Sequence, residues 1–506
     1  MERRIKNIGV IGAGIMGIGI VQIAVQANHP VYLYDAQPNA AKNAYEKLNA
    51  TFSRLVEKNK ISQSELEQAL SNLHIVENIQ DLHACDLIIE AIIEKLEIKQ
   101  TLMKQLESIV SPQCILASNT SSLSITEIAA ECQHPERVVG YHFFNPVPLM
   151  KVVEIIQGLH TDAQIIEQLS ELARNIGHHP VRTKDTPGFI INHAGRAYGT
   201  EALKILSENI ASIPAIDLIL KKSLGFKMGP FELLDLTGLD VSHPVMLSIY
   251  NQYFQEPRYR PNVLTQQMLI GKKLGRKTSE GFYKYIDQVK QEIPIVQKYS
   301  ANCHGLKTVW LSTEFKDDFE KLSAYLAQKN IQINPNTQPD ADDLILIANY
   351  GDDATYSALR LGVNPEQVVC IDMLGNFEHC RTLMPSLITK PKMIEAALDL
   401  FSQPDCETIV IDESLGFISQ RVLAMVVNLA CDMAQQKIAT VEDINAAVKL
   451  GLGYPFGPIE WGDVIGKEKI LRILERISSI SQDPRYRPSP WLQRRCKLNL
   501  SLMHQQ

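Results

Sequence analysis

Short apolar runs recur over residues 1–185, and polar or turn-forming residues bound each of them. The runs are Ile8–Ile11, Val31–Tyr34, Leu87–Ile89, Ile115–Ala117, Val138–Tyr141 and Val152–Ile156. Strands that are buried on both faces have such short continuous apolar sequences. Longer amphipathic stretches lie between the runs, so the pattern predicts a doubly wound α/β sheet with mainly parallel strands.

The first predicted strand leads into a glycine-rich turn. This turn has the pattern GxGxxG, with the residues Gly12, Ala13, Gly14, Ile15, Met16 and Gly17, and a predicted helix over Ile18–Ala27 follows. Gly12 permits the tight turn, Gly14 lets the backbone approach a pyrophosphate, and Gly17 lets helix and strand pack closely. The helix N-terminus then faces the phosphates. The turn predicts a dinucleotide site, although FAD uses the same pattern as NAD.

An acidic residue ends the second predicted strand. Asp35 follows Gly17 at the spacing where a carboxylate accepts hydrogen bonds from the adenosine ribose hydroxyls. The next three residues include no arginine that could bind a 2′-phosphate. We therefore predict NAD rather than NADP as the cofactor.

From Asp185 onward the apolar positions follow helical spacing, and the sequence repeats itself. Gly188-Phe189-Ile190 returns as Gly416-Phe417-Ile418, and the sequence PRYRP at 257–261 returns at 484–488 with nearly the same displacement. Residues 290–405 have alternating α/β texture but no GxGxxG pattern. The repeats predict an internal duplication.

The composition of the 506 residues excludes several classes of protein. Apolar residues make up 45% and charged residues 21%, as in ordinary globular proteins. The net charge of −7 is unlike that of a nucleic-acid binder. No apolar run reaches the ~18 residues that span a bilayer, and no separate apolar segment precedes a cleavage site. We expect a cytoplasmic protein with no nucleic-acid or membrane partner. The nine scattered cysteines predict reduced thiols and no metal site.

A histidine and a glutamate occupy two successive predicted strands. His142 lies toward the carboxyl end of one strand, at the edge where open α/β sheets bind ligands, and Glu154 lies in the next. A carboxylate in so apolar a run needs a partner. An imidazole can accept a proton from an alcohol while the carboxylate fixes its tautomer. The alternative is a structural histidine and a solvent-facing glutamate.

Six longer segments carry a family resemblance. They are GAGIMG (12–17), EAIIE (90–94), ASNTSSL (117–123), HFFNPVPLMKVVEI (142–155), DTPGFIIN (185–192) and GPFELLDLTGLD (229–240). Over roughly residues 5–285 the chain resembles the L-3-hydroxyacyl-CoA dehydrogenases. One departure is Asn28, where family members usually carry glycine. Asparagine tolerates the left-handed backbone, so we expect the turn to form.

The resemblance implies a role for each matching position. His142 matches the general base that takes the C3 hydroxyl proton while hydride passes to the nicotinamide, and Glu154 matches its partner. Ser121 matches the serine that binds the reacting oxygen, and Asn192 matches the asparagine that closes the site. The resemblance implies NAD contacts at Glu94, Lys99, Asn145 and Lys277, and CoA contacts at Ser53 and Lys60. No metal is implied.

The patterns and the resemblance together predict a Rossmann-type doubly wound NAD domain, an all-α domain, a degenerate α/β segment and a second all-α domain. The predicted ranges are 1–185, 186–285, 286–405 and 406–506. In the second copy Asn192 maps to Gln420, and Asp372 is the nearest match to the histidine. We therefore predict one active site per chain. The helical domains of shorter family members pair between subunits, so we predict a monomer with an internal pseudo-dimer, or a homodimer.

The leading functional prediction is NAD-dependent oxidation of (3S)-3-hydroxyacyl-CoA to 3-oxoacyl-CoA. The duplicated form resembles enzymes of phenylacetate catabolism that act on 3-hydroxyadipyl-CoA, while 3-hydroxybutyryl-CoA and other fatty-acid intermediates remain open. A carboxylate tail needs a cation, and Arg196 lies four residues after Asn192; the alternative for Arg196 is a surface salt bridge.

Two other functional classes are alternatives to this prediction. A non-catalytic NAD-binding or structural relative would not need Ser121, His142, Glu154 and Asn192 intact. A 3-hydroxyacid dehydrogenase acting on free acids usually carries a lysine where this chain has Asn192.

Overall fold

The computed structural model describes residues 5–296, 298–301 and 305–505, which form two compact units. Unit 1 contains the residues up to His193 together with residues 436–452, and unit 2 contains residues 194–435 and those from 453 onward. Cys303 lies outside the described residues, and the eight described cysteines are reduced thiols. None of the helices in the described part of the chain has both the length and the apolar character needed to cross a membrane.

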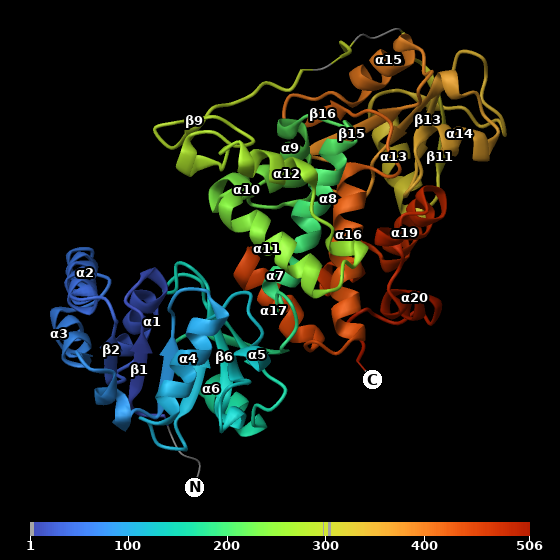
Figure 1. Cartoon of the computed structure of the whole chain (residues 1–506). Coiled ribbons are helices and arrows are strands. Elements are labelled where there is room, and N and C mark those ends of the chain that lie inside the picture. Colours follow the sequence, from blue (N-terminus) through green and yellow to red (C-terminus); the bar gives the residue numbers. More distant parts are fainter. Residues whose placement is uncertain (1–4, 297, 302–304, 506) are drawn as a thin grey trace. The chain divides into compact units, whose positions relative to one another are not determined.

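Unit 1 is built on one eight-stranded sheet (Figure 1). In spatial order its strands are β3 (Leu73–Ile75), β2 (Val31–Tyr34), β1 (Ile8–Ile11), β4 (Leu87–Glu90), β5 (Ile115–Ser118), β6 (Val138–Phe143), β7 (Val152–Gln157) and β8 (His179–Lys184). All neighbours are parallel except β6 and β7. The six predicted strands are confirmed, and the sheet adds β3 and β8.

Helices cover both faces of this sheet. Along β4, Leu87 and Ile89 join one apolar cluster and Ile88 joins the other, because successive side chains point to opposite faces. The first cluster includes residues of α1 (Ile15–Gln26), α2 (Ala40–Glu57), α3 (Gln63–Ser71) and α6 (Ala163–Asn175), and the second includes residues of α4 (Leu96–Glu107) and α5 (Ile125–Ala129). The predicted doubly wound fold is confirmed.

The turn between α1 and β2 contains Asn28, where family members usually carry glycine. Its φ angle is 63°, in the left-handed region. Asparagine adopts this backbone conformation at a lower energetic cost than most other residues except glycine. The turn therefore forms, as predicted.

Unit 2 contains a second, smaller sheet. In spatial order its strands are β12 (Gln332–Ile333), β11 (Thr308–Thr313), β13 (Leu344–Ala348), β14 (Val368–Ile371), β15 (Cys380–Pro385) and β16 (Glu407–Val410). Its helices are α13 (Lys316–Gln328), α14 (Ala354–Leu361) and α15 (Pro391–Phe401). The pair β14–β15 is antiparallel and β15–β16 is parallel, as β6–β7 and β7–β8 are in unit 1. The last three strands of each sheet therefore have the same order and the same relative directions.

Two similar sets of helices account for most of the remaining chain. The first set is α8 (Arg196–Ser207), α9 (Ile213–Leu224), α10 (Pro230–Thr237), α11 (Leu239–Gln252) and α12 (Val263–Ile270). The second set is α16 (Ile418–Gln435), α17 (Val441–Leu452), α18 (Pro458–Ile465), α19 (Lys467–Ser481) and α20 (Pro490–Lys497). Among the described residues, the remaining α-helix and strands are α7 (Ile191–Ala194), β9 (Tyr285–Ile286) and β10 (Val289–Lys290).

The two helical sets meet in unit 2 through one long helix of each set and through both PRYRP sequences. Helix α8 packs against α16, its counterpart in the second set. Arg258 of the first PRYRP sequence forms an ion pair with Asp432 of the second set. Arg485 of the second PRYRP sequence lies 3.7 Å from Glu201 of the first set. Each PRYRP sequence thus lies near an acidic residue of the other helical set.

Candidate active site

The glycine turn after β1 leaves room for a ligand at one of its three glycines. Gly12 has a φ of 106°, which favours glycine, and a side chain at Gly17 would collide with the Gly12 carbonyl oxygen. A Cβ on Gly14 would meet nothing within 4 Å. The open position lies at the N-terminus of α1, where backbone N–H groups are available to an anion. Here Ile15 is exposed and Met16 is half-buried.

A cavity of about 740 Å³ adjoins this turn and includes Gly14 and Asp35 in its lining. The Asp35 carboxylate accepts hydrogen bonds from the backbone N–H groups of Ala13 (2.7 Å) and Gln37 (2.8 Å). Each carboxylate oxygen keeps a further acceptor position, which a ribose hydroxyl can use. The remaining lining is largely apolar, with Ile92, Ile98 and Leu102. These residues fit the adenosine half of NAD.

His142 and Glu154 lie directly opposite each other on β6 and β7. Nδ1 of His142 lies 2.7 Å from Oε2 of Glu154, and both side chains are buried. Oε1 of Glu154 accepts hydrogen bonds from the backbone N–H groups of Ile190 (2.9 Å) and Ile191 (2.8 Å). An ionised carboxylate only accepts, so Nδ1 carries the ring proton and Nε2 can accept one.

Asn192 connects this pair to the Ser121 turn. It directly follows Ile191, which holds Glu154, and its Nδ2 lies 3.4 Å from the Ser121 carbonyl oxygen. The structure thus brings the four residues implied as catalytic into one continuous set of contacts within unit 1.

Sequence reasoning missed Asp185, whose carboxylate accepts hydrogen bonds from the Ser124 hydroxyl and two following backbone N–H groups. Its position in the segment DTPGFIIN was the available signal.

Glu94 organises the turn that carries Ser121. Its Oε1 accepts hydrogen bonds from the Thr120 hydroxyl (2.6 Å) and from the backbone N–H groups of Ser121 (2.9 Å) and Ser122 (3.2 Å). Burial raises the pKa of the Glu94 carboxyl, but Lys99 and these hydrogen bonds outweigh burial and hold the pKa below its usual range. Glu94 is therefore ionised at neutral pH.

Lys99 is a buried lysine whose ammonium group is held by two carboxylates. Its Nζ lies 2.8 Å from both oxygens of Glu90 and 3.3 Å from Glu94. Glu90 also accepts a hydrogen bond from the Ser118 hydroxyl. Sequence reasoning missed Glu90, although it ends an apolar strand and therefore needs a partner. The geometry indicates that Lys99 fixes Glu94 and, through it, the Ser121 turn.

We expect Lys99→Met to destabilise unit 1 strongly. The substitution leaves Glu90 buried without its counter-ion, and breaking a buried ion pair costs about 3–5 kcal/mol. Lys104→Met on the same helix is the matched control, because Lys104 is exposed and its ion pair with Glu131 is 3.6 Å long. The control should stay within about 0.5 kcal/mol of the wild type. Urea unfolding measures both, and equal midpoints would contradict the expectation.

Four further residues are implied to contact a ligand. Lys277 belongs to unit 2, where its Nζ lies 2.7 Å from Asp240. Ser53 donates its hydroxyl to a backbone carbonyl of its own helix α2, and Lys60 is exposed beyond that helix. Asn145 is exposed in the turn after β6. The ligand contacts of these four residues stay predictions.

The second sheet keeps the position of the histidine but fills it differently. Asp372 follows β14, and its backbone N–H donates to the Thr382 carbonyl on β15. The Asp372 carboxylate accepts hydrogen bonds from Ser419 and from Nε2 of Gln420, which lies 3.1 Å away. Burial raises the pKa of Asp372. At this position the second sheet therefore has a buried carboxyl group opposite a threonine, and no imidazole that could act as a base.

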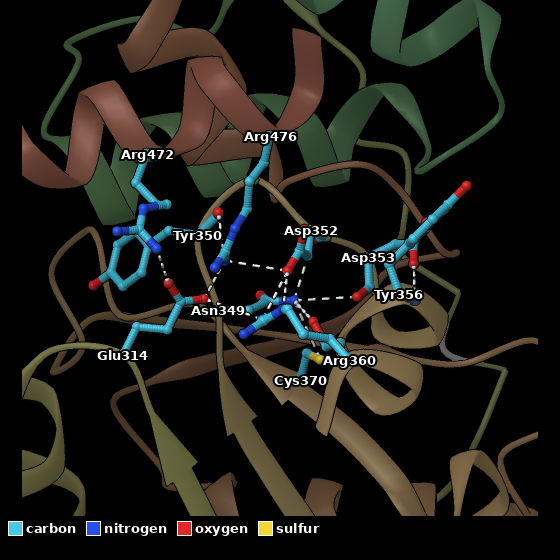
Figure 2. A network of polar contacts seen from close by, with 12 residues as sticks. Glu314, Asn349, Tyr350, Asp352, Asp353, Tyr356, Arg360, Cys370, Arg472 and Arg476 are labelled. Carbon is cyan, nitrogen blue, oxygen red and sulfur yellow. Dashed lines mark hydrogen bonds and ion pairs between the residues drawn. The ribbon is translucent and has the colours of Figure 1, made fainter. Parts of the chain in front are cut away.

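A salt-bridge network occupies the carboxyl edge of the second sheet (Figure 2). Glu314 follows β11 directly, where the glycine turn follows β1, and it forms ion pairs with Arg476 and with Arg472 (3.6 Å). Asp352 lies 2.7 Å from Arg360 and 3.1 Å from Arg476. The ion pairs fill this edge, and the turn after β11 has none of the glycines that let a backbone approach a pyrophosphate. Within the described residues, no group of three or more His, Cys, Asp or Glu side chains is arranged to hold a metal ion.

Two family models match the chain. The NAD-binding domain of 3-hydroxyacyl-CoA dehydrogenase matches residues 7–186. The C-terminal domain of 3-hydroxyacyl-CoA dehydrogenase matches residues 188–285 and again residues 416–502. The double match confirms the predicted duplication.

Some known proteins match almost the whole chain, and others match about half of it. A 3-hydroxyadipyl-CoA dehydrogenase of Escherichia coli (strain K12) is 36% identical over 498 residues, covering 98% of this chain and 99% of that protein. A mitochondrial hydroxyacyl-coenzyme A dehydrogenase of Rattus norvegicus is 38% identical over 287 residues, covering 56% of this chain and 91% of that protein. The crystal structure of a 3-hydroxybutyryl-CoA dehydrogenase from Escherichia coli K12 superposes with a TM-score of 0.87 at 36% identity, covering 98% of this chain and 99% of that one.

Proposed function

The chain belongs to the 3-hydroxyacyl-CoA dehydrogenase family, whose members are NAD-dependent oxidoreductases, and from this premise we propose that it oxidises (3S)-3-hydroxyadipyl-CoA to 3-oxoadipyl-CoA. The hydrogen-bonded His142–Glu154 pair carries the reaction class. The relative that matches the whole length of the chain carries the substrate class, because that protein is a 3-hydroxyadipyl-CoA dehydrogenase.

The buried pair provides a base for the C3 hydroxyl. Nε2 of His142 accepts the hydroxyl proton, and the Glu154 carboxylate stabilises the imidazolium that forms. Ser121 and Asn192, which are in contact, bind and orient the reacting oxygen. When bound, NAD supplies the hydride acceptor.

The residues of the glycine turn would hold the cofactor. The open backbone at Gly14 and the N–H groups of Ile15 and Met16 would face the pyrophosphate, because they begin helix α1. Asp35 would accept hydrogen bonds from the adenosine ribose. One active site per chain follows, because Glu314 and Asp372 replace the glycine turn and the histidine in the second sheet.

A substrate panel tests this function. NADH oxidation is followed by absorbance with acetoacetyl-CoA, a medium-chain 3-oxoacyl-CoA and 3-oxoadipyl-CoA, and we expect the highest kcat/KM with 3-oxoadipyl-CoA. A higher value with acetoacetyl-CoA would assign a short-chain substrate instead. Bound NAD without turnover of any thioester would favour a non-catalytic relative, and turnover of free 3-hydroxy acids would favour the free-acid class.

A further inference from the structure

Helix α17 belongs to the second helical set but packs on the first sheet. It lies in unit 1 and contacts β7 and β8. Its buried residues Ile444, Ala447 and Val448 follow one helical face. Just before the helix, the Ile438 carbonyl accepts a hydrogen bond of 2.9 Å from the Lys184 backbone N–H of β8. The second set therefore supplies an apolar face and a backbone acceptor to the NAD domain.

The equivalent helix of the first set makes the corresponding contact in unit 2. Helix α9 packs on β15, the counterpart of β7. The Ser223 carbonyl of α9 accepts a hydrogen bond of 2.7 Å from the Asn376 backbone N–H. Ser223 and Gly451 of α17 are equivalent positions of the two copies, because they are displaced from each other as Gly188 is from Gly416. Each set thus covers the sheet of the other copy, so the position of α17 is part of the duplicated architecture.

The contact of α17 reaches the residues that hold Glu154. A Cβ on Gly451 would collide with Cδ1 of Ile191 and lie 3.1 Å from its Cγ1. The Ile191 backbone N–H is one of the two donors to Oε1 of Glu154, and Glu154 lies on β7, one of the strands that α17 covers. Asn192 is the next residue. Gly451 therefore packs against the segment that joins Glu154 to Asn192.

We propose that α17 is a positioning element for the active site and that Gly451 is its positioning residue. This inference rests on the proposed function. The close approach at Gly451 fixes Ile191, and Ile191 fixes the Glu154 carboxylate behind His142. A displacement of about 1 Å at a catalytic group can lower a rate about 10²-fold, so a contact outside the substrate site can control turnover. The second copy then acts in catalysis although its own sheet lacks the catalytic pair.

The test is a double-mutant experiment on the full chain. Gly451→Ala introduces the Cβ that collides with Ile191, and Ile191→Val removes the Cδ1 atom it meets. We expect Gly451→Ala to lower kcat about tenfold while the Kd for NAD changes less than about twofold, because the cavity at Gly14 and Asp35 does not include these residues. Combining it with Ile191→Val should restore kcat to within about threefold of Ile191→Val alone.

A purely structural role predicts a different result. The φ of Gly451 is not positive, and alanine usually stabilises such a helical position by about 0.4–1 kcal/mol. Gly199→Ala is the matched control, since a Cβ there meets nothing within 4 Å, and it should leave kcat unchanged. Wild-type kcat in Gly451→Ala, or a loss that Ile191→Val does not relieve, would overturn the proposal.

A second readout separates this inference from the proposed function. Hydrogen–deuterium exchange of residues 186–193 should become faster in Gly451→Ala and return toward the wild-type rate in the double variant. Turnover of no 3-oxoacyl-CoA by the wild type would overturn the proposed function and, with it, the catalytic role of α17. Unchanged exchange in Gly451→Ala would overturn the contact itself, whatever the wild-type activity.

Discussion

His142→Gln lowers kcat about 10²-fold or more and leaves the Kd for NAD within about twofold of the wild type. Glutamine can still donate a hydrogen bond to Glu154, but its side chain cannot take a proton from an alcohol near neutral pH. A positioned general base contributes about 10²–10⁴-fold to a rate. NAD affinity persists because the cavity at Gly14 and Asp35 is lined by residues of β1, β2 and α4, by the segments after β1, β2 and β4, and by Ile79, and His142 is not among them.

Steady-state NADH absorbance and a separate NAD titration measure the two effects of this substitution. His160→Gln is the matched control, because His160 is exposed in the same unit and should keep wild-type kcat. Wild-type turnover in His142→Gln would remove His142 from the role of base. A parallel loss of NAD affinity would instead assign His142 to the cofactor site.

Most of the strands that sequence alone predicted are buried on both faces. The bounds of β1 and β2 are readable because each is a short apolar run that ends abruptly at a glycine or a polar residue. The strand β8 escaped prediction because its sequence, HPVRTK, carries charges and a proline at the edge of the sheet. Its apolar contacts come partly from α17, which lies far along the chain in the second copy.

The candidate site also contains residues that the sequence predicts and residues that it does not predict. His142 and Glu154 were predictable because both occupy apolar strands, where a polar residue needs a partner. The ion pair of Lys99 with Glu90 was not, because a lysine on an amphipathic helix usually reaches solvent, and only the coordinates show its ammonium group buried. The exchange of α9 and α17 was not predictable either. A linear division of the chain cannot show that a helix of one copy packs on the sheet of the other.

Deletion of residues 286–506 gives an insoluble or inactive fragment. In the full chain, Glu201 of α8 is fully buried, lies 2.8 Å from Arg421 of α16, and accepts a hydrogen bond of 2.7 Å from the Tyr486 hydroxyl. The deletion removes both partners and uncovers the face of α8 that packs on α16. A buried carboxylate without its counter-ion costs about 3–5 kcal/mol, comparable to much of the stability of a domain.

The deletion also removes α17 from β7 and β8, so the strand that carries Glu154 loses its cover. A fragment that stays soluble by pairing with a second copy still needs a helix that covers β7 and β8. In that second copy, α9 is the helix that corresponds to α17 in the duplication. Soluble yield, size-exclusion chromatography and kcat measure the outcome, and co-expression with residues 286–506 should restore activity. A soluble fragment with full kcat by itself would show that the first copy needs no second helical set, because its exposed faces and Glu154 would then be stable without one.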